Sequence, residues 1–214
     1  MIPIKKQNEP RSLLEYKKQI GAHYNGFPDK DELRESLMRE QGYVCAYCMR
    51  RIPETRDLPS NVQPVTVEHW DAQSENDVAL GLDYRNMFAV CAGNRGCGDN
   101  NRMTCDAHRG NTPLTVNPLK PDTLDGIYYK NGCILSTNPE VQKDLHETLN
   151  LNGPVLVSCR QSVLNDYIKN AVKKNHKTGS LKIFCERQMK LLLEANSKIP
   201  YSGIIIDWLK KHIR

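Results

Sequence analysis

A series of thiols and histidines in the middle of the chain constrains its fold more than any other feature. The series runs over 64 residues and contains, in order, Cys45, Cys48, Glu68, His69, Asn86, Cys91, Cys97, Cys105 and His108. Cys45 and Cys48 form a Cys-x-x-Cys pair, and two thiolates on such a tight turn can share one tetrahedral zinc. Thiols that can hold a structural metal therefore enclose a His, Asn and His series that can hold a catalytic one.

The remaining ligands of such a zinc are not fixed by spacing. Cys91, Cys97 and Cys105 are three candidates for two positions, so one of them is expected to stay outside the site. A redox dithiol is the other interpretation of the Cys-x-x-Cys pair. It is disfavoured because no βαβ pattern surrounds the pair and more cysteines follow it. The three later cysteines are expected to be small buried hydrophobic residues: Cys133, Cys159 and Cys185.

An acid, two histidines and an amide lie within the same thiol-bounded stretch. Glu68 and His69 end a predicted strand, and Asn86 and His108 follow. Hydrolysis of a phosphodiester needs a base for the attacking water, a divalent cation for the developing charge and groups that orient both. Imidazole suits the base, while carboxylate and amide oxygens suit Mg²⁺ or Mn²⁺. The combination indicates metal-assisted cleavage of a phosphodiester.

Composition indicates a small core and an intracellular setting. The chain has 214 residues, of which 39% are hydrophobic and 7% aromatic, so a bound metal is expected to add to the stability of the fold. Residues 1–8 contain no apolar secretory segment, and the apolar run at 203–206 is too short to cross a bilayer. We therefore expect a cytoplasmic protein, in which eight cysteines favour metal binding over disulfides.

Charge is unevenly distributed along the chain. Residues 151–214 contain 12 Lys and Arg against 4 Asp and Glu, whereas residues 1–150 contain 18 against 21. A basic C-terminal third suits a polyanionic partner such as a nucleic acid. A solvated helical surface explains the same charge, and on charge alone it is the simpler explanation.

Periodicity and turn signals predict a mixed α and β chain. Helices are predicted at 11–22, 29–41, 139–149, 158–175 and 180–196, with a final helix from about Ile204. A strand is predicted at 64–70, and residues 84–91 fit either a second strand or a short helix. Residues 53–64, 71–83 and 92–104 are predicted to be loops. Residues 128–135 resemble a hairpin with an Asn-Gly turn.

With this series of thiols, acid, histidines and asparagine, the chain resembles the HNH endonuclease family, whose core is the ββα-metal fold. The segments Gln41–Cys48, Val67–Trp70, Arg85–Cys91 and Cys105–Asn111 resemble the HNH nucleases of retron and Septu antiphage systems, the PtuB-like proteins. The closing segment 203–211 resembles theirs as well. The likeness covers most of the chain and is most specific between residues 41 and 111.

The resemblance implies a role for each matching residue. His69 would be the general base, Glu68 a metal ligand, Asn86 a metal ligand or an orienting group, and His108 a metal or phosphate ligand. Structural zinc would be bound by the four cysteines Cys45, Cys48, Cys91 and Cys105, with Cys97 in a segment of variable length. Glu68 stands where many HNH enzymes have Asp, and His108 where related proteins often carry Lys.

The expected fold class is therefore α+β, with a zinc-stapled ββα-metal core at 45–112. An N-terminal helical segment, 1–44, and a mainly helical basic region, 113–214, flank it. The resemblance also implies a PtuA-like SMC/ABC ATPase as partner, nucleic acid as substrate with DNA favoured over RNA, and, in retron systems, a reverse transcriptase with its multicopy single-stranded DNA. A zinc module that only binds nucleic acid or protein is the main alternative, and a thiol oxidoreductase is a remote one.

Overall fold

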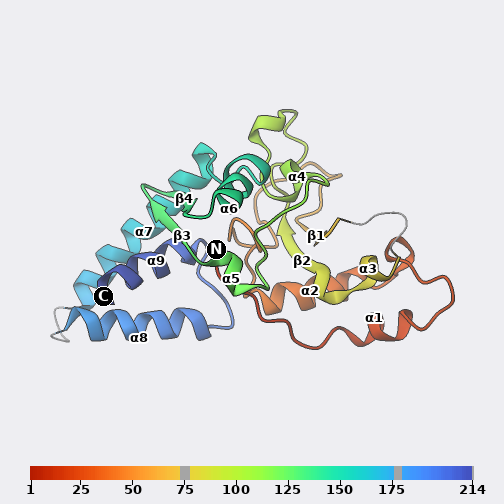
Figure 1. Cartoon of the computed structure of the whole chain (residues 1–214), viewed down its shortest axis with the longest axis horizontal. Helices are drawn as coiled ribbons and strands as arrows, with labels where there is room; N and C mark the ends of the chain where they lie inside the picture. The colour runs from red at the N-terminus through yellow and green to blue at the C-terminus, as the bar shows by residue number, and fades with distance from the viewer. Residues whose placement is uncertain (73–77, 176–179, 214) are drawn as a thin grey trace.

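A computed structural model describes residues 1–72, 78–175 and 180–213 of the chain (Figure 1). It is an α+β structure, as predicted, with two small antiparallel sheets. The helices are α1 (Arg11–Tyr16), α2 (Lys30–Glu40), α3 (Val78–Leu82), α4 (Asp106–Arg109), α5 (Pro121–Leu124), α6 (Pro139–Lys143), α7 (Pro154–Asn175), α8 (Leu181–Glu194) and α9 (Ser202–Ile213). The strands are β1 (Val65–His69), β2 (Met87–Cys91), β3 (Ile127–Lys130) and β4 (Cys133–Ser136).

Strands β1 and β2 form the hairpin that carries most of the candidate site. They pair antiparallel, with Val65 opposite Cys91 and His69 opposite Met87. Beta-branched residues favour β1, and every residue of β2 is buried. Neighbouring residues of a strand point to opposite faces, so Glu68 and His69 project to opposite sides of this hairpin.

The strongest sequence patterns predict their elements correctly. The predicted helix at 29–41 is confirmed as α2, the predicted strand at 64–70 as β1, and the hairpin at 128–135 as β3 and β4. The turn of that hairpin has positive φ at both Asn131 (51°) and Gly132 (80°), which is what an Asn-Gly turn provides. The three long C-terminal helices also lie where they were predicted, although α7 begins earlier, at Pro154.

Weaker patterns give wrong boundaries. The helix predicted at 11–22 ends at Tyr16, because residues 17–22 bury no side chain that could hold further helical turns against the protein. The loop predicted at 71–83 contains α3, and its residues 73–77 lie outside the described part of the chain. The helix predicted at 139–149 divides into α6 and a wider π-type turn, η4 (Asp144–Thr148). Residues 84–91 contain both alternatives, a 3₁₀ turn η2 (Tyr84–Asn86) followed by β2.

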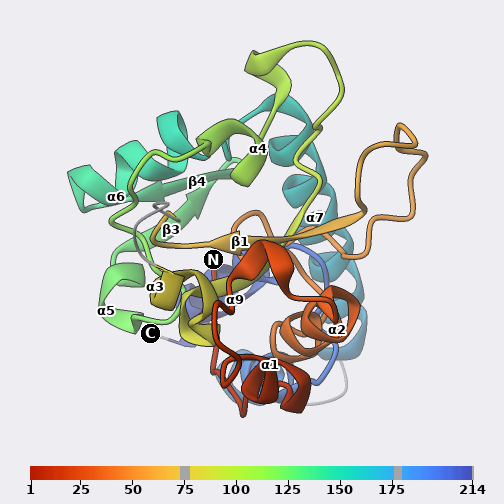
Figure 2. The same ribbon diagram turned by 90° about the vertical axis from the view of Figure 1, so that its right-hand side faces the viewer.

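The helices pack on the two hairpins in two groups. Helix α2 contacts β1 and β2, whereas α9 contacts α7, α8 and β3; Figure 1 shows these two groups at opposite ends of the molecule. Figure 2 shows α4 and the 92–104 loop above the β1–β2 hairpin, with α1 and α2 below it. One buried cluster includes residues from all parts of the chain, such as Leu33, Phe88, Leu145 and Ile205. The segment boundaries at 44 and 112 stay predictions.

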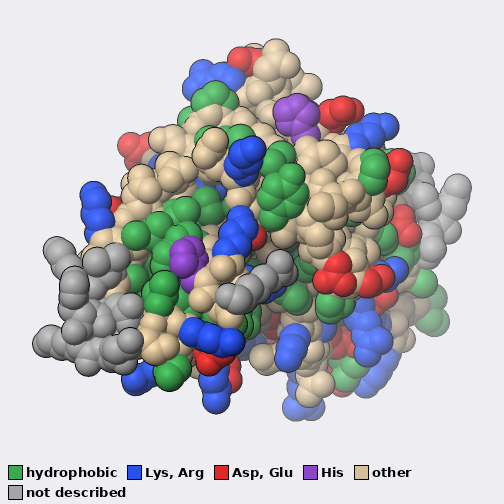
Figure 3. All heavy atoms as spheres, turned by 60° about the vertical axis from the view of Figure 1, so that its left-hand side comes forward, with side chains coloured by type: hydrophobic (Ala, Val, Ile, Leu, Met, Phe, Trp, Pro, Cys, Tyr) green, Lys and Arg blue, Asp and Glu red, His purple; other side chains and the backbone are tan. Residues whose placement is uncertain are grey.

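Basic side chains are spread over the surface around the C-terminal helices. On the face in Figure 3, Lys and Arg side chains lie scattered among acidic and hydrophobic ones and form no single stripe. The positive balance of residues 151–214 therefore does not mark one polyanion-binding path on this face. Within the described residues, no helix has both the length and the apolar character needed to cross a bilayer.

Lys6 connects the N-terminal segment to the β1–β2 hairpin at a half-buried position. Its Nζ donates to the Met87 carbonyl oxygen at 2.6 Å, lies 3.5 Å from a Glu40 carboxylate oxygen and sits 4.2 Å from the centre of the Tyr84 ring. Burial lowers the pKa of Lys6 from 10.5 to about 8, and Glu40 opposes the shift. The folded protein therefore holds this proton less tightly than the unfolded chain.

This shift predicts how stability changes with pH. Between pH 8 and 10.5 the unfolded chain binds more protons at Lys6 than the folded protein, so the stability contributed by Lys6 rises with pH across that window. The free energy of unfolding of the wild type, minus that of Lys6→Met, should increase by on the order of 1–3 kcal/mol from neutral pH to about pH 10. Urea denaturation of both proteins measures it. A difference that stays flat with pH would show that Lys6 keeps its ordinary pKa.

Candidate metal centre and the polar cluster beside it

Four cysteines from three parts of the chain meet in the interior. Cys45 and Cys48 lie on the tight turn before β1, Cys91 ends β2 and Cys105 directly precedes α4. All four are buried, and their sulfur atoms lie within 4.8 Å of one another. Neighbouring sulfurs are 3.6 Å apart for Cys48 and Cys91, and 3.8 Å apart for Cys105 with Cys45 and with Cys91.

This geometry fits a tetrahedral metal. Zinc–sulfur bonds of about 2.3 Å place the sulfurs of a tetrahedral site roughly 3.8 Å apart. Disulfide bonding is excluded, because bonded sulfurs lie about 2.05 Å apart and all eight cysteines are free. The four buried thiols can therefore bind a metal such as zinc. Within the described residues, no second group of three or more His, Cys, Asp or Glu side chains gathers in this way.

The surroundings favour negative charge on the Cys48 sulfur in particular, whereas burial raises the pKa of Cys105 and hydrogen bonds from Cys45 and Cys48 raise that of Cys91. The Arg50 backbone N–H donates to the Cys48 sulfur at 3.4 Å, and its guanidinium, which is paired with Glu54 at 2.7 Å, lies close enough to influence Cys48 and Cys91. Hydrogen bonds from the other three thiols, with Cys105 first, lower the pKa of Cys48 well below its usual value. A thiolate is the form that binds zinc.

The structure also separates the competing cysteines. Cys105 belongs to the group, whereas Cys97 is exposed, with its sulfur 3.2 Å from the Asp99 carbonyl oxygen. Of the three later cysteines, Cys185 is buried as predicted, while Cys133 and Cys159 are only half-buried.

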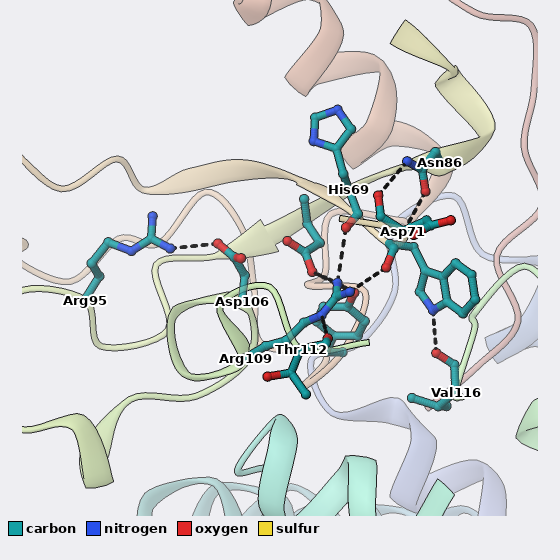
Figure 4. A network of polar contacts seen from close by, with 11 residues as sticks. His69, Asp71, Asn86, Arg95, Asp106, Arg109, Thr112 and Val116 are labelled. Atoms are coloured by element: carbon teal, nitrogen blue, oxygen red, sulfur yellow. Dashed lines mark hydrogen bonds and ion pairs between the residues drawn. The ribbon is translucent and has the colours of Figure 1, made fainter. Parts of the chain in front are cut away.

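Glu68 is the centre of a buried polar cluster at the end of β1. Only 5% of Glu68 is exposed. Its Oε1 accepts a hydrogen bond from the Tyr47 hydroxyl at 3.0 Å and forms an ion pair with Arg109 of α4. The other carboxylate oxygen, Oε2, takes no part in these two contacts. Figure 4 shows Arg109 reaching from α4 to the end of the strand.

Arg109 holds α4 against the strand through several further bonds. Its guanidinium donates to the carbonyl oxygens of His69 at 3.1 Å, Trp70 at 2.5 Å and Thr112 at 2.7 Å (Figure 4). Two of these acceptors lie at and just after the end of β1, and the third lies just after α4. One buried guanidinium therefore holds the strand end against the helix. Nothing in the sequence pattern distinguishes Arg109 from an ordinary surface arginine.

A second carboxylate stands next to Glu68. Asp106, in the first turn of α4, lies close enough to Glu68 for its carboxyl to influence the pKa of Glu68. Asp106 also pairs with Arg95 at 2.7 Å (Figure 4). Burial and the Asp106 carboxyl raise the pKa of Glu68 to about 8, while Arg109 opposes the shift. Two facing carboxyls in a mostly buried place share a proton or a cation more readily than they hold two charges.

His69 points away from this carboxylate cluster. Figure 4 shows its ring directed away from Arg109 and Asp106. The ring Nε2 lies 3.0 Å from the Gly81 carbonyl oxygen, and the ring packs edge-on against Tyr24 with centres 4.6 Å apart. Burial lowers the pKa of His69 below 6.5. The imidazole is therefore neutral at pH 7 and is oriented by a backbone carbonyl.

Asn86 acts on the backbone that follows His69. Its Oδ1 accepts from the Asp71 N–H at 2.8 Å, and its Nδ2 donates to the carbonyl oxygens of Asp71 at 2.9 Å and Leu80 at 3.3 Å (Figure 4). Both ends of the amide are used in this way. As arranged here, Asn86 holds the turn after β1 and so positions the residues around His69.

His108 is directed to another part of the molecule. Its Nδ1 lies 3.0 Å from the Thr148 carbonyl oxygen in η4. In a helix, residues three apart share a face, so Asp106 and Arg109 both face Glu68 while His108 does not. Glu68, Asn86 and His108, the three ligands suggested for a catalytic divalent ion, thus each bond to different partners. The i, i+3 spacing of Asp106 and Arg109 is the signal that would have selected them.

The contacts of Arg109 predict a large effect of its removal. Arg109→Met removes the buried hydrogen-bond partner of the Glu68 carboxyl and the guanidinium that donates to three carbonyl oxygens, so it should lower the free energy of unfolding by about 3–5 kcal/mol. Arg85→Met, at an exposed position in η2, is the matched control and should change stability by less than about 0.5 kcal/mol. Urea denaturation at neutral pH compares them. Equal stability of the two variants would contradict a structural role for Arg109.

Comparison with known proteins adds no family to these observations. The chain matches no protein-family model, and a search of the curated proteins finds no match. The likeness to HNH nucleases therefore stays an expectation from the sequence motifs.

Proposed function

We propose that this protein is a metal-dependent HNH-type endonuclease that hydrolyses phosphodiester bonds. The observation that carries the proposal is the meeting of two carboxyls, Glu68 of β1 and Asp106 of α4, beside the cysteine group. Glu68 is adjacent in sequence to His69, and Asp106 to Cys105. The metal-binding thiols thus fix the hairpin and the short helix that together present an acid pair and a histidine.

His69 is the proposed general base. A carbonyl oxygen only accepts hydrogen bonds, so the contact with Gly81 places the ring proton on Nε2 and the lone pair on Nδ1. Because burial lowers its pKa, the ring is mostly unprotonated at neutral pH, the form in which a general base acts. Asn86 supports this role by holding the turn that follows His69.

The carboxyl pair is the proposed site of the catalytic cation. Carboxylate oxygens suit Mg²⁺ or Mn²⁺, and Oε2 of Glu68 is not used by Tyr47 or Arg109. When bound there, the divalent ion would stabilise the negative charge that develops on the phosphate. Because the His69 ring points away from the carboxyl pair, substrate binding would have to bring the ring and the ion to the same phosphate. Asp106 takes the place that the motif comparison gave to His108, whose contact with Thr148 instead anchors α4 to η4. Asn86 remains a positioning group.

A non-catalytic zinc module is the second candidate, and one observation favours it. Arg109 already neutralises Glu68 without any divalent ion, as a purely structural ion pair would. This candidate predicts one tightly bound metal and no turnover that depends on Mg²⁺ or Mn²⁺. It assigns no task to the orientation of His69.

The biological setting is proposed from the motif resemblance alone. We infer an effector of a prokaryotic retron or Septu-type antiphage system, acting with a PtuA-like SMC/ABC ATPase and, in the retron case, with a reverse transcriptase and its multicopy single-stranded DNA. DNA is the favoured substrate over RNA. Because an unrestrained nuclease is toxic to its host, we expect the partners to hold the activity back until infection.

The test is a cleavage assay on DNA and on RNA with the purified chain, alone and with its partner ATPase. We expect cleavage that requires added Mg²⁺ or Mn²⁺ and that is lost in His69→Ala. Cleavage at equal rates by the wild type and His69→Ala would remove His69 from the proposed mechanism. Absence of divalent-dependent cleavage under every condition would favour the non-catalytic module.

A further inference from the structure

A cavity of about 380 Å³ lies beside the cysteine group and is separate from the carboxyl pair. Its walls come from the 56–59 segment, the 94–102 loop and the first turn of α7. Arg95 belongs to this wall and also pairs with Asp106 at 2.7 Å. The Arg95 side chain thus connects the cavity wall to the proposed cation site, and the left side of Figure 4 shows its pair with Asp106.

The cavity is rich in arginine. Arg50, Arg56, Arg95 and Arg102 all line it, together with Asp57. Arg50 and Arg56 share one carboxylate, that of Glu54, at 2.7 and 3.2 Å. Asp57 is the one carboxylate in the wall, and Glu54 and Asp106 pair with its arginines from outside, so three carboxylates against four guanidiniums leave one positive charge uncompensated. Arginine guanidinium groups match phosphate oxygens in geometry and charge.

Two further features of the cavity suit an anion better than a cation. The first turn of α7, Pro154 to Leu156, lines the cavity, and the first N–H groups of a helix have no acceptor within the helix. Thr104 also lines the cavity; only 3% of it is exposed, and its hydroxyl has no hydrogen-bond partner. A buried hydroxyl without a partner is costly unless a ligand or water satisfies it.

The rest of the wall is apolar. Leu58, Pro59, Val155 and Leu156 lie around the same space, and Val155 is 61% exposed although it is hydrophobic. An apolar surface next to arginines suits a ligand with a flat organic part and a phosphate. A nucleotide has both parts, and bases pack readily on apolar side chains.

We propose that this cavity binds one nucleotide unit, with its phosphate held by Arg102, the Thr104 hydroxyl and the first turn of α7. The phosphate belongs either to a polynucleotide strand or to a free nucleotide. If it belongs to a strand, the bound unit lies next to the cleaved bond, because Arg95 and Asp106 connect the cavity to the proposed cation site. That placement rests on the proposed nuclease function. The binding of a phosphate does not depend on it.

The test measures binding to the full-length protein without added divalent ions, so that nothing is cleaved. The probe is a fluorescein-labelled single-stranded DNA oligonucleotide followed by anisotropy, with AMP as unlabelled competitor. Arg102→Gln should weaken binding about tenfold, the loss expected for one charged contact to phosphate. Arg187→Gln removes the same charge from an exposed position on α8 and should leave binding within about twofold.

Thr104→Val separates a ligand-binding role from a structural one. Replacing an unpartnered buried hydroxyl by a methyl group of similar size should leave the melting temperature unchanged or raise it. The same variant should weaken oligonucleotide binding several-fold, because valine cannot donate to a phosphate. Stabilisation together with weaker binding is a combination that general surface attraction does not produce.

Cys97 gives a second readout, because it is exposed and lines the cavity. Bound oligonucleotide should slow its alkylation by iodoacetamide, measured by peptide mass spectrometry. If AMP both protects Cys97 from alkylation and displaces the oligonucleotide, the ligand is a free nucleotide. If only the oligonucleotide protects Cys97, the ligand is a strand. The proposal is overturned if neither ligand protects Cys97, or if Arg102→Gln and Arg187→Gln bind alike. His69→Ala should bind like the wild type, so loss of the nuclease assignment would leave this result intact.

Discussion

Cys48→Ser is expected to lose its metal and a large part of its stability. Metal binding contributes on the order of 10 kcal/mol to the folding of small zinc domains. The loss here should be smaller, about 5 kcal/mol, because the C-terminal helices pack on β3 and on one another without help from the thiols. Cys48 is buried and brings together β2 and the turn before β1 through Cys91, so the hairpin should be affected first.

Metal analysis and thermal denaturation of the same samples measure this effect. The wild type should contain one zinc per chain and melt at a lower temperature after treatment with a strong chelator. Cys97→Ser is the matched control, since Cys97 lies in the same thiol-rich stretch but is exposed and outside the group. It should keep both zinc and stability. If Cys48→Ser melts at the same temperature as the wild type, the four thiols do not form a structural metal site.

His69→Ala is expected to reduce nuclease activity by about 10²–10⁴-fold, the usual contribution of a general base. Its stability should change much less, because the ring is only partly buried and its Nε2 bonds to a backbone carbonyl oxygen, that of Gly81. His146→Ala removes an exposed imidazole from η4 and should retain full activity. Initial rates with Mg²⁺ and with Mn²⁺ compare the three proteins.

The same base predicts a pH profile. Burial lowers the pKa of His69 below 6.5, so the neutral, proton-accepting form already dominates at pH 7. The rate should be nearly constant above neutrality and fall in acid, with a midpoint below pH 6.5. A midpoint above pH 7 would assign the essential base to another group.

Local patterns in the sequence were sufficient for the strongly periodic elements. Val65, Thr66 and Val67 predicted β1, and the Asn131–Gly132 pair predicted the hairpin of β3 and β4. Local patterns failed where a helix needs tertiary packing to be stable. Residues 17–22 adopt no helix because none of their side chains is buried. Helix α4 has only four residues, too few for a periodic signal, and its absence from the sequence prediction hid the shared face of Asp106 and Arg109.

The sequence by itself determined that a Cys-x-x-Cys turn, an acid–histidine pair at a strand end and two further thiols would lie in one compact segment, because spacing and local propensity are properties of the chain alone. The motif resemblance already placed Cys105 rather than Cys97 in the thiol group, and the structure confirms that grouping. Only the tertiary structure decided that Glu68 meets Asp106 and Arg109. That meeting depends on the direction in which α4 presents its side chains. That direction is set by long-range contacts, chiefly the bonds of Arg109 to the end of β1 and of His108 to Thr148.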